Sequence, residues 1–494
     1  MAISNPGGLL NSVPAPGKQT LSTNYFDFAN AANAGWGQQY LPDLMEKEAE
    51  VFGPRTISGF LSKIGAEEAM QADQVVWSEQ GRLHLSYKGD VDATNVVTIQ
   101  SDIDGNGFAE GGMAAHGIRL NDTVIVANAQ GVFKCIVTSI TADNFDITVA
   151  HYGGTDITTD ATNSGTTILV YGSEYAKATG YNAADATTVE SRGANEPDFK
   201  TFTNKPIIMK DYYEVSGSDT ARVGWIEVSG EEGQSGYMWY LKAEADTRAR
   251  FNDYLEMAML EAEVNLLDNP AAGVDDFLYG ADGTNSTGTE GLFAVIESRG
   301  NVTTGVTGVN AATDLAEFDA ILAEFDKQGA IEENMMFVNR ATSLAMDDML
   351  ASMNSYGAGG TSYGVFENDE DMALNLGFSG FRRGSYDFYK SDFRYLNDKA
   401  TRGGINDANT ANAIRGVIVP AGTSTVYDQQ LGKNLKRPFL HVRYRASQTD
   451  NRRMKTWTTG SVGAATSALD AMQIHFLSER CLITQGANNF MLMK

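Results

Sequence analysis

A short string of acidic and amide residues, Asp102-Ile103-Asp104-Gly105-Asn106-Gly107, has the composition best suited to bind a metal ion. Oxygen ligands at alternate positions, followed by glycine, are typical of the start of a calcium-binding loop. The twelfth position of such a loop, where a bidentate glutamate is expected, is Met113, and no helical pattern flanks the string. We therefore interpret the string as a hairpin turn. Whether Asp102, Asp104 and Asn106 bind a cation stays an open alternative.

Other catalytic signatures are missing from the sequence. It contains no G-x-x-x-x-G-K-[ST] phosphate loop, no H-E-x-x-H and no C-x-x-C, and Leu376–Phe381 (LGFSGF) does not match a nucleophile elbow. The glycine-rich run Gly357–Gly364 holds no lysine, which favours a flexible loop over a nucleotide cradle. The histidines are isolated from one another: His84, His116, His151, His441 and His475. The sequence thus predicts no catalytic, cofactor-binding or metal-binding residues, no cofactor, and a protein that is not an enzyme.

The chain is strongly acidic. Its 494 residues include 37 Lys+Arg and 63 Asp+Glu, which gives a formal net charge of −26. Because binding to nucleic acid phosphates requires clustered Lys and Arg, this charge argues against a general polyanion binder. The basic residues that do gather lie late in the chain: Arg382, Arg383, Lys390, Arg394, Lys433, Lys436, Arg437, Arg443, Arg445, Arg452, Arg453 and Lys455. We expect them to contact acidic surfaces of neighbouring copies, with contact to nucleic acid as the alternative.

The two cysteines, Cys135 and Cys481, are too few for a disulfide-dense secreted scaffold or a four-thiolate zinc site. They favour a reducing cytoplasm. The N-terminal sequence MAISNPGGLLNSVPAPGKQ also lacks the basic start and apolar core of a signal peptide. No run approaches the ~20 apolar residues that span a bilayer. We expect no association with a membrane.

The first half of the chain combines extended segments with a β-rich block. Residues 1–35 are rich in Pro, Gly, Asn and Ala and predict an extended arm, and Tyr40–Phe52 predicts a short amphipathic helix. Alternating apolar and polar residues in Val75–Tyr87 predict strands with a turn at Gln80-Gly81. Between Gly89 and Glu190, turn signals separate five short β-rich runs, which predict an inserted barrel or sandwich: VVTIQ, DTVIVA, VFKCIVTSI, FDITVA and TTILVYG.

A long helix is predicted after further strands in Phe199–Val228. No Pro or Gly interrupts Tyr237–Leu267, and at 1.5 Å per residue this segment would be roughly 45 Å long. Steps of three and four residues place six residues on one face: Phe251, Tyr254, Leu255, Ala258, Ala262 and Leu266.

The last part of the chain predicts a mixed α/β body. Gly280–Gly308 has the composition of a loop, and a helix over Asp314–Gln328 is expected to begin at a Thr313 cap and to end at Gly329. A strand at Met335–Val338 and a second helix at Ala341–Met353 follow. Later strands are predicted around Phe388, Ile418, Phe439, Ile474 and Leu482.

The order of these elements resembles the HK97-type major capsid protein of tailed bacteriophages. The string Phe337-Val338-Asn339-Arg340-Ala341-Thr342 and the ending Arg480–Met493 (RCLITQGANNFMLM) are similar to strings of that family. The resemblance implies an α+β, HK97-like capsid fold with N-terminal arm, E-loop, spine helix, peripheral and axial domains, to which an inserted all-β barrel-like domain is added. The implied divisions are an arm at 1–52, the start of the peripheral domain and the outgoing E-loop limb at 53–88, the insert at 89–190, the returning limb at 191–232, the spine helix and peripheral domain at 233–310, and the axial domain with the C-terminal strands at 311–494.

The resemblance also implies a function: a structural protein that self-assembles into the icosahedral head enclosing the phage genome. Implied partners are further copies in hexameric and pentameric capsomers, portal, scaffold and decoration proteins, and double-stranded DNA enclosed without sequence-specific binding. The implied location is the virion, after assembly in the host cytoplasm. Extended arms and loops suit such a role because they bury area on adjacent subunits. One alternative is another self-assembling shell or tail protein, such as an encapsulin-like compartment or a tail component. An enzyme or a surface-layer or adhesin module is a further alternative.

Overall fold

The computed structural model describes residues 59–60, 66–79, 84–93, 95–103, 105, 107, 116–141, 146–157, 165–178, 200–217, 227–229, 235–265, 278, 288–329, 331–354, 380–421, 423–428, 433–460 and 469–494. The expected arm, the helix at Tyr40–Phe52 and the run Gly357–Gly364 lie outside these residues. The chain divides into two compact units. One consists of residues 1–76 and 203–494, and the other is the intervening segment Trp77–Phe202.

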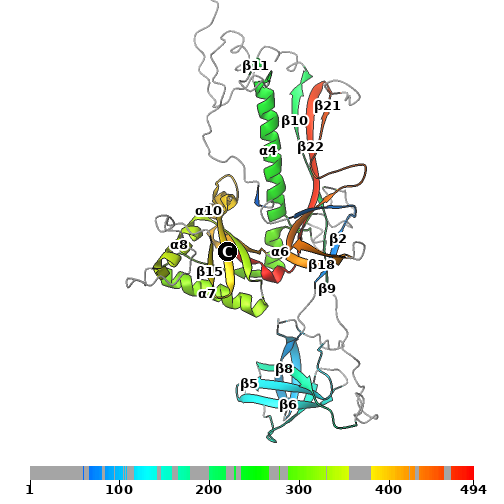
Figure 1. Cartoon of the computed structure of the whole chain (residues 1–494), viewed down its shortest axis with the longest axis vertical. Helices are drawn as coiled ribbons and strands as arrows, with labels where there is room; N and C mark the ends of the chain where they lie inside the picture. The colour runs from blue at the N-terminus through cyan, green and yellow to red at the C-terminus, as the bar shows by residue number, and fades with distance from the viewer. Residues whose placement is uncertain are drawn as a thin grey trace, which may run out of the picture. The chain divides into compact units, whose positions relative to one another are not determined.

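The intervening unit is a closed six-stranded barrel (Figure 1). Around the barrel its strands follow the order β3 (Ser86–Ala93), β4 (Val96–Asp102), β7 (Asp146–His151), β6 (Gly131–Ile140), β5 (Asp122–Asn128) and β8 (Thr166–Ser173), and β8 pairs with β3 to close it. Alternate residues of each strand point inward and are almost completely buried, among them Val97, Ile99, Val124, Val126, Cys135, Val137, Ile147 and Val149. The barrel therefore has a hydrophobic core of its own.

Five of the six barrel strands coincide with the β-rich runs of the sequence, and the sixth does not. β3 (SYKGDVDA) contributes only Tyr87 and Val91 to the core, so its sequence lacks a β signature although it closes the barrel. The string Asp102–Gly107 leaves β4 in a turn, where the Gly105 N–H donates to the Asp102 carbonyl and Ser101 bridges Gly107. Asp104 and Asn106 lie outside the described residues, so the cation alternative stays untested.

The segments expected to form the two E-loop limbs contain strands that pair in different sheets, and their assignment to an E-loop stays a prediction. β2 (Val75–Glu79) and β9 (Lys200–Asn204) do form a two-stranded sheet, beside the points where the barrel unit begins and ends. The next strand, β10 (Ile207–Ser216), does not continue this pairing, because all ten of its residues pair with β22 (Ala471–Thr484). Ten residues of the segment expected to form the returning limb are thus a strand of the main body, and their partner strand lies some 260 residues further along the chain.

The first sheet of the main body is organised around β22. On one side β22 pairs with β10; on the other it pairs with β21 (Lys455–Thr459) near its start and with β20 (Leu440–Arg445) near its end. β1 (Ala66–Met70) adds to β20 in parallel. Sequence reasoning treated Ala471–Leu477 and Arg480–Gln485 as two strands, whereas the structure has a single strand of 14 residues.

The long helix α4 (Met238–Glu261) lies alongside β10 and β22 (Figure 1). It has 24 residues, about 36 Å at 1.5 Å per residue, and is shorter than predicted. The helix ends where the chain begins to pair with residues further along the sequence. The Gly291 N–H donates to the Ala262 carbonyl, and Val264 forms a β-bridge with Gly288. Phe251 and Leu255 are buried as expected, while Tyr254 is 43% exposed and does not belong to the packed face.

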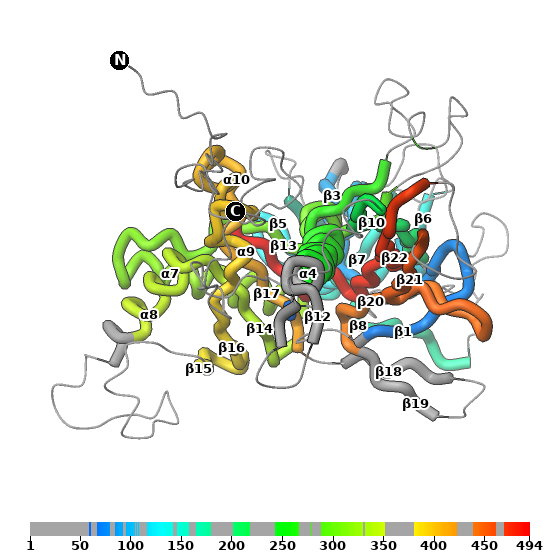
Figure 2. The backbone as a smooth tube through the Cα atoms, turned by 90° about the horizontal axis from the view of Figure 1, so that it is seen from above, coloured from blue at the N-terminus to red at the C-terminus, as the bar shows by residue number. Residues whose placement is uncertain are grey.

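The second sheet of the main body is a six-stranded α/β sheet. Its strands follow the order β13 (Asn301–Thr303), β23 (Met491–Met493), β17 (Gly416–Pro420), β14 (Glu333–Val338), β16 (Tyr386–Asp392) and β15 (Gly380–Arg383). The helices α7 (Ala311–Gln328) and α8 (Arg340–Asn354) lie on one side of it, and α4 lies on the other (Figure 2). Phe318, Ile321 and Phe325 of α7 pack against apolar residues of β14, β16, β17 and β23.

Two details of the helices differ from the sequence predictions. The cap of α7 is Asn310, whose side chain accepts a hydrogen bond from the Thr313 N–H, so Thr313 lies in the first turn. Gly329 ends the helix in the left-handed conformation, as predicted. The presumed loop Gly280–Gly308 contains a helix, α6 (Leu292–Arg299), between Gly291 and Gly300. Because glycines flank this segment, its composition predicted a loop. The helix nevertheless buries four apolar residues: Leu292, Phe293, Val295 and Ile296.

One hydrophobic cluster joins the two sheets of the main body. Phe337, Val417 and Leu492 come from the α/β sheet, while Leu440, Val442 and Leu482 come from the sheet around β22. Met259 and Leu260 of α4, three residues of α6 and Phe60 also belong to it. The Phe60 ring lies 4.7 Å from Phe337 and 4.9 Å from Phe393, measured between ring centroids.

Shorter elements complete the described structure. The hairpins are β11 (Glu227–Ser229) with β12 (Ser235–Tyr237), and β18 (Thr423–Asp428) with β19 (Lys433–Pro438). The short helices are α9 (Arg394–Asn397), α10 (Arg402–Ala408), η4 (Thr410–Asn412) and η5 (Ala487–Asn489). The Glu261 carboxylate at the end of α4 accepts hydrogen bonds from the Tyr395 hydroxyl and the Arg402 guanidinium, each at 2.8 Å.

Because the barrel has its own core, its removal should leave the main body folded. We expect a variant in which a short Gly-Ser turn joins Glu79 to Lys200, keeping β2 and β9, to retain cooperative unfolding of the body. Circular dichroism with thermal unfolding measures this. The matched control is Phe318→Ala in the same background, which should lower the unfolding midpoint because a fully buried phenylalanine contributes about 3–5 kcal/mol. An insoluble or non-cooperative deletion variant would contradict the independence of the two units.

Candidate assembly face and charge network

The described residues hold no cluster that resembles a catalytic or metal centre. Among them, no group of three or more His, Cys, Asp or Glu side chains is arranged to hold a metal ion. The histidines lie apart: His116 is buried beside Tyr87, His151 contacts Thr155, His441 lies near the Pro438 carbonyl, and His475 lies in β22. None of the helices described combines the length and the hydrophobicity needed to cross a bilayer.

The sheet around β22 is covered by helix on one face. Phe251 and Leu255 of α4 pack against Ile474 and Phe476 of β22, with Met209 of β10 beside them. The Phe251 and Phe476 ring centroids are 6.0 Å apart. Because side chains alternate along a strand, the residues between these positions point away from α4. The outer face of the sheet is therefore set by the register of β10, β22 and β21.

An aromatic row crosses this outer face. Register places Tyr212 opposite His475 and His475 opposite Trp457. The rings stack along the row, with centroids 6.0 Å apart for Tyr212 and His475 and 5.1 Å apart for Trp457 and His475. Tyr212 is nevertheless 56% exposed and Trp457 36% exposed. We name these three residues the aromatic row.

Polar groups border the aromatic row. The Gln473 amide donates to the Glu214 carboxylate at 2.6 Å, and Thr459 lies 3.1 Å from the His475 Nε2. Ile208, at the other end of β10, is 54% exposed. An exposed aromatic centre with a polar rim is the composition that protein interfaces favour. The outer face of the sheet therefore has the chemistry of a contact surface.

The basic residues that gather late in the chain form ion pairs within it, and their contact with neighbouring copies stays a prediction. Every one whose side chain is described pairs with an acidic residue of the same chain: Arg382 with Asp387, Arg383 with Asp319, Lys390 with Asp347, Arg394 with Asp398, Arg443 with Glu68, Arg445 and Arg452 with Glu479, Arg453 with Glu67, and Lys455 with Asp450. The side chains of Lys433, Lys436 and Arg437 lie outside the description. The described members of this group are thus charge-paired within the chain, and some stay largely exposed, with Arg382 at 63% and Arg453 at 57%.

The densest charge pairing fastens β1 to the sheet. Glu479 in β22 is 5% exposed at its side chain and accepts ion pairs from Arg445 and Arg452. Glu67 in β1 pairs with Arg453 and lies 3.8 Å from Arg480. Burial lowers the pKa of the Arg480 guanidinium, and this buried group is held by hydrogen bonds to the Ser478 hydroxyl and the Arg453 carbonyl. A strand close to the N-terminus is thus held by charges near the C-terminus.

A second anchor holds the chain just before β1. The Glu256 carboxylate on α4 accepts hydrogen bonds from the backbone N–H groups of Gly59, at 2.6 Å, and Phe60, at 3.3 Å. Burial raises the pKa of Glu256, and these two hydrogen bonds oppose the shift. Gly59 has φ 126°, a conformation that favours glycine and lets both donors reach one carboxylate.

Sequence reasoning missed the aromatic row. It recognised strands near Ile474 and in Phe199–Val228, but the three aromatic residues come from segments separated by up to 263 residues. Within β22, the alternation in MQIHF was the available signal, because it marks a strand covered on one face only. Which tyrosine and tryptophan would flank His475 depends on the register, which local sequence does not determine.

Comparison with known proteins finds similarity at the level of structure only. No family model matches the chain, and no curated protein matches its sequence. A chain from Microbacterium phage Oxtober96 is 10% identical with a TM-score of 0.36, over 95% of this chain and 99% of that one. A chain from Mycobacterium phage Bobi is 7% identical with a TM-score of 0.35, over 91% and 94%. A chain titled as the capsid of an empty GTA particle computed with C5 symmetry is 13% identical with a TM-score of 0.32, over 95% and 98%.

Loss of Glu479 should destabilise the main body. Glu479→Ala leaves Arg445 and Arg452 without their shared carboxylate, at a cost of about 3 kcal/mol, the low end for a buried ion pair because these arginines are 27% and 29% exposed. Denaturant unfolding of the unassembled subunit measures the loss. The control Glu324→Ala removes an exposed pair with Lys327 and should change stability by less than about 0.5 kcal/mol. Equal effects of the two variants would contradict the anchoring role of Glu479.

The Glu256 anchor should make stability depend on pH. Its pKa in the folded chain lies above the ordinary value of 4.5, so the folded state retains the proton more strongly than the unfolded state. The resulting stabilisation is complete below pH 4.5 and is lost as the pH rises through the raised pKa. Glu256→Gln keeps an acceptor without the charge, so the unfolding midpoint of the variant relative to that of the unmodified chain should rise with pH from 4.5 upward. Parallel midpoints across this range would show that the carboxylate is not buried as described.

Proposed function

We propose that this chain is a major capsid protein that self-assembles into the icosahedral head of a tailed bacteriophage. Its fold is proposed to be HK97-like, with α4 as the spine helix and the sheet around β22 in the peripheral domain. The six-stranded sheet with α7 and α8 would form the core of the axial domain. Residues 1–52 would form the arm, β2 and β9 the base of the E-loop, and the barrel a domain inserted into that loop.

The observation that carries this proposal is the one-sided sheet around β22. α4 covers one face through Phe251 and Leu255, while the opposite face presents Tyr212, His475 and Trp457. Burial of these partly exposed aromatic side chains by a partner would contribute favourable free energy to association. In a shell of identical subunits that partner is another copy of the same chain.

The charge distribution supports a shell protein and not a protein that binds nucleic acid. The formal net charge is −26, and the described members of the late basic cluster are paired within the chain. A surface of this sign repels packed double-stranded DNA, so the genome can be enclosed without adhering to the shell. Hexameric and pentameric capsomers, portal, scaffold and decoration proteins as partners, assembly in the host cytoplasm and residence in the virion belong to the same proposal.

The proposal predicts that the aromatic row is needed for assembly. The unmodified chain, expressed alone or with its scaffold, should form rings, tubes or shells visible by negative-stain electron microscopy and by light scattering. Trp457→Ala should reduce the assembled fraction at least tenfold, because truncation of a central interface aromatic costs about 2 kcal/mol or more. The subunit itself should stay folded, since Trp457 is 36% exposed.

The matched control is Tyr212→Phe, which keeps the ring and removes only the hydroxyl. It should assemble like the unmodified chain, whereas Tyr212→Ala should not. A stable monomer at high concentration under all salt and crowding conditions would overturn the proposal. Particles that enclose protein cargo and exclude DNA would instead support an encapsulin-like compartment.

A further inference from the structure

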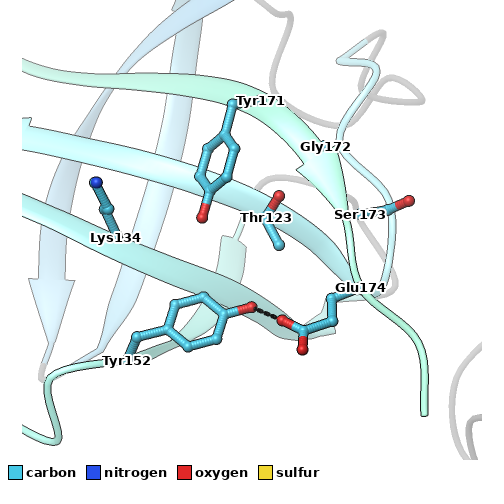
Figure 3. A pocket seen from close by; sticks show the side chains of 7 residues that line it. All are labelled: Thr123, Lys134, Tyr152, Tyr171, Gly172, Ser173 and Glu174. Atoms are coloured by element: carbon cyan, nitrogen blue, oxygen red, sulfur yellow. Dashed lines mark hydrogen bonds between the residues drawn. The ribbon is translucent and has the colours of Figure 1, made fainter. Parts of the chain in front are cut away.

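The barrel carries an open pocket on its outer surface that the shell function does not require. It is lined by Thr123 of β5, Lys134 of β6, Tyr152 just after β7, Tyr171, Gly172 and Ser173 of β8, and Glu174 (Figure 3). Its volume is about 510 Å³. These strands are neighbours in the order β7-β6-β5-β8, so the pocket lies across four adjacent strands. Its size falls within the range of sites for small ligands.

Two tyrosines shape the pocket, and both are half-exposed: Tyr152 at 52% and Tyr171 at 51%. Tyr171 points outward by the alternation of β8, since Ile168 and Val170 contact the barrel core, and the ladder between β5 and β8 shifts register at this residue. Thr123 pairs with Gly172 and Val124 with Val170, which leaves Tyr171 in a bulge. Bulges of this kind redirect a side chain and often lie at functional sites. In Figure 3, the Tyr171 and Tyr152 rings extend from opposite sides of the pocket.

Gly172 keeps the pocket open between the tyrosines. A Cβ atom at this position would lie 3.3 Å from the Thr123 hydroxyl oxygen. Any larger side chain would therefore extend into the space beside Thr123. Replacement of Gly172 by a larger residue would therefore fill the pocket while all of its polar groups stay in place.

The Tyr152 ring is fixed by its hydroxyl, which donates a hydrogen bond to the Glu174 carboxylate (Figure 3). This bond raises the pKa of Tyr152 to about 12. The backbone N–H of Glu174 donates to the Asn121 carbonyl at 3.0 Å, and the Tyr152 N–H donates to the Lys134 carbonyl at 3.1 Å. Both partners are thus held by the barrel backbone, and the pocket is preorganised.

The chemistry of the lining selects a class of ligand. Its single cation, Lys134, is balanced by Glu174, so nothing in the pocket favours a phosphate or another polyanion. The tyrosine faces offer stacking surfaces for the C–H face of a sugar ring, because the face of an aromatic ring is electron-rich. Lys134, Glu174, Thr123 and Ser173 offer donors and acceptors for hydroxyl groups. Neutral pyranoses combine these two requirements.

We propose that the pocket between Tyr152 and Tyr171 binds a neutral pyranose unit of an oligosaccharide. Tyr171 is the stacking platform, and Lys134, Glu174, Thr123 and Ser173 bind the hydroxyl groups. The barrel would thus be a carbohydrate-binding module. This inference does not depend on whether the chain forms a shell.

The test uses the full-length chain on a printed array of neutral oligosaccharides, followed by saturation-transfer NMR with the trisaccharide that binds best. We expect binding to at least one glycan, with transfer from aromatic protons to the sugar C–H protons. Tyr171→Ala should weaken binding about tenfold, because it removes the stacking surface. Gly172→Leu should weaken it similarly by filling the pocket while every polar group stays in place.

The matched control is Tyr389→Ala, which removes a 52% exposed tyrosine of β16, outside the barrel and the aromatic row, and should leave glycan binding unchanged. Circular dichroism of each variant confirms that the barrel is folded. No binding to any glycan of the array, or binding that both Tyr171→Ala and Gly172→Leu leave intact, would overturn the proposal. Binding to a single-stranded DNA oligonucleotide or to peptides, with none to glycans, would overturn it as well.

Discussion

The pairing of β22 is the interaction on which the main body depends. Along its first residues the strand has a face covered by α4 and a face that is partly exposed, and from Phe476 to Thr484 every residue is buried. In this second stretch β22 pairs with β20 and contributes Leu482 to the cluster that also contains Phe337 and Leu492 of the other sheet. One strand therefore passes from a one-sided sheet into a core shared by both sheets. Any change in its register would move the aromatic row and this core together.

The ion pairs around β22 also connect distant segments of the main body. A buried strand that contains Glu479 and Arg480 would be unfavourable without partners, because desolvation of a charge exceeds the gain from burial. Arg445, Arg452 and Glu67 supply those partners, and β1 is fastened in the process. The Glu256 carboxylate holds Gly59 and Phe60 on α4 in a comparable way. A network of this kind compensates the charges that are buried in and beside β22.

The barrel differs from the main body in its strand pairing, its core and its outer surface. Three of its six strand pairings join consecutive strands, its core is separate, and its outer surface bears a pocket with two exposed tyrosines. A unit that enters and leaves the body beside one short ladder, β2 with β9, can vary its surface with little effect on the body's cores. Assembly and ligand binding can therefore reside in separate parts of one chain.

Local pattern was sufficient for much of this molecule. Five barrel strands, α7 with its Gly329 stop, α8, and three of the six strands of the α/β sheet (β14, β16 and β17) follow from periodicity and turn residues that act over a few positions. The sequence also determined the acidic charge and the absence of common catalytic motifs. Only the tertiary structure decided that Ile207–Ser216 pairs with β22, that α4 ends at Glu261, that the late basic residues are paired internally, and that Tyr212, His475 and Trp457 form a row. Each of these depends on a partner far away in the chain, and the free energy of such a contact belongs to the pair of segments and not to either segment alone.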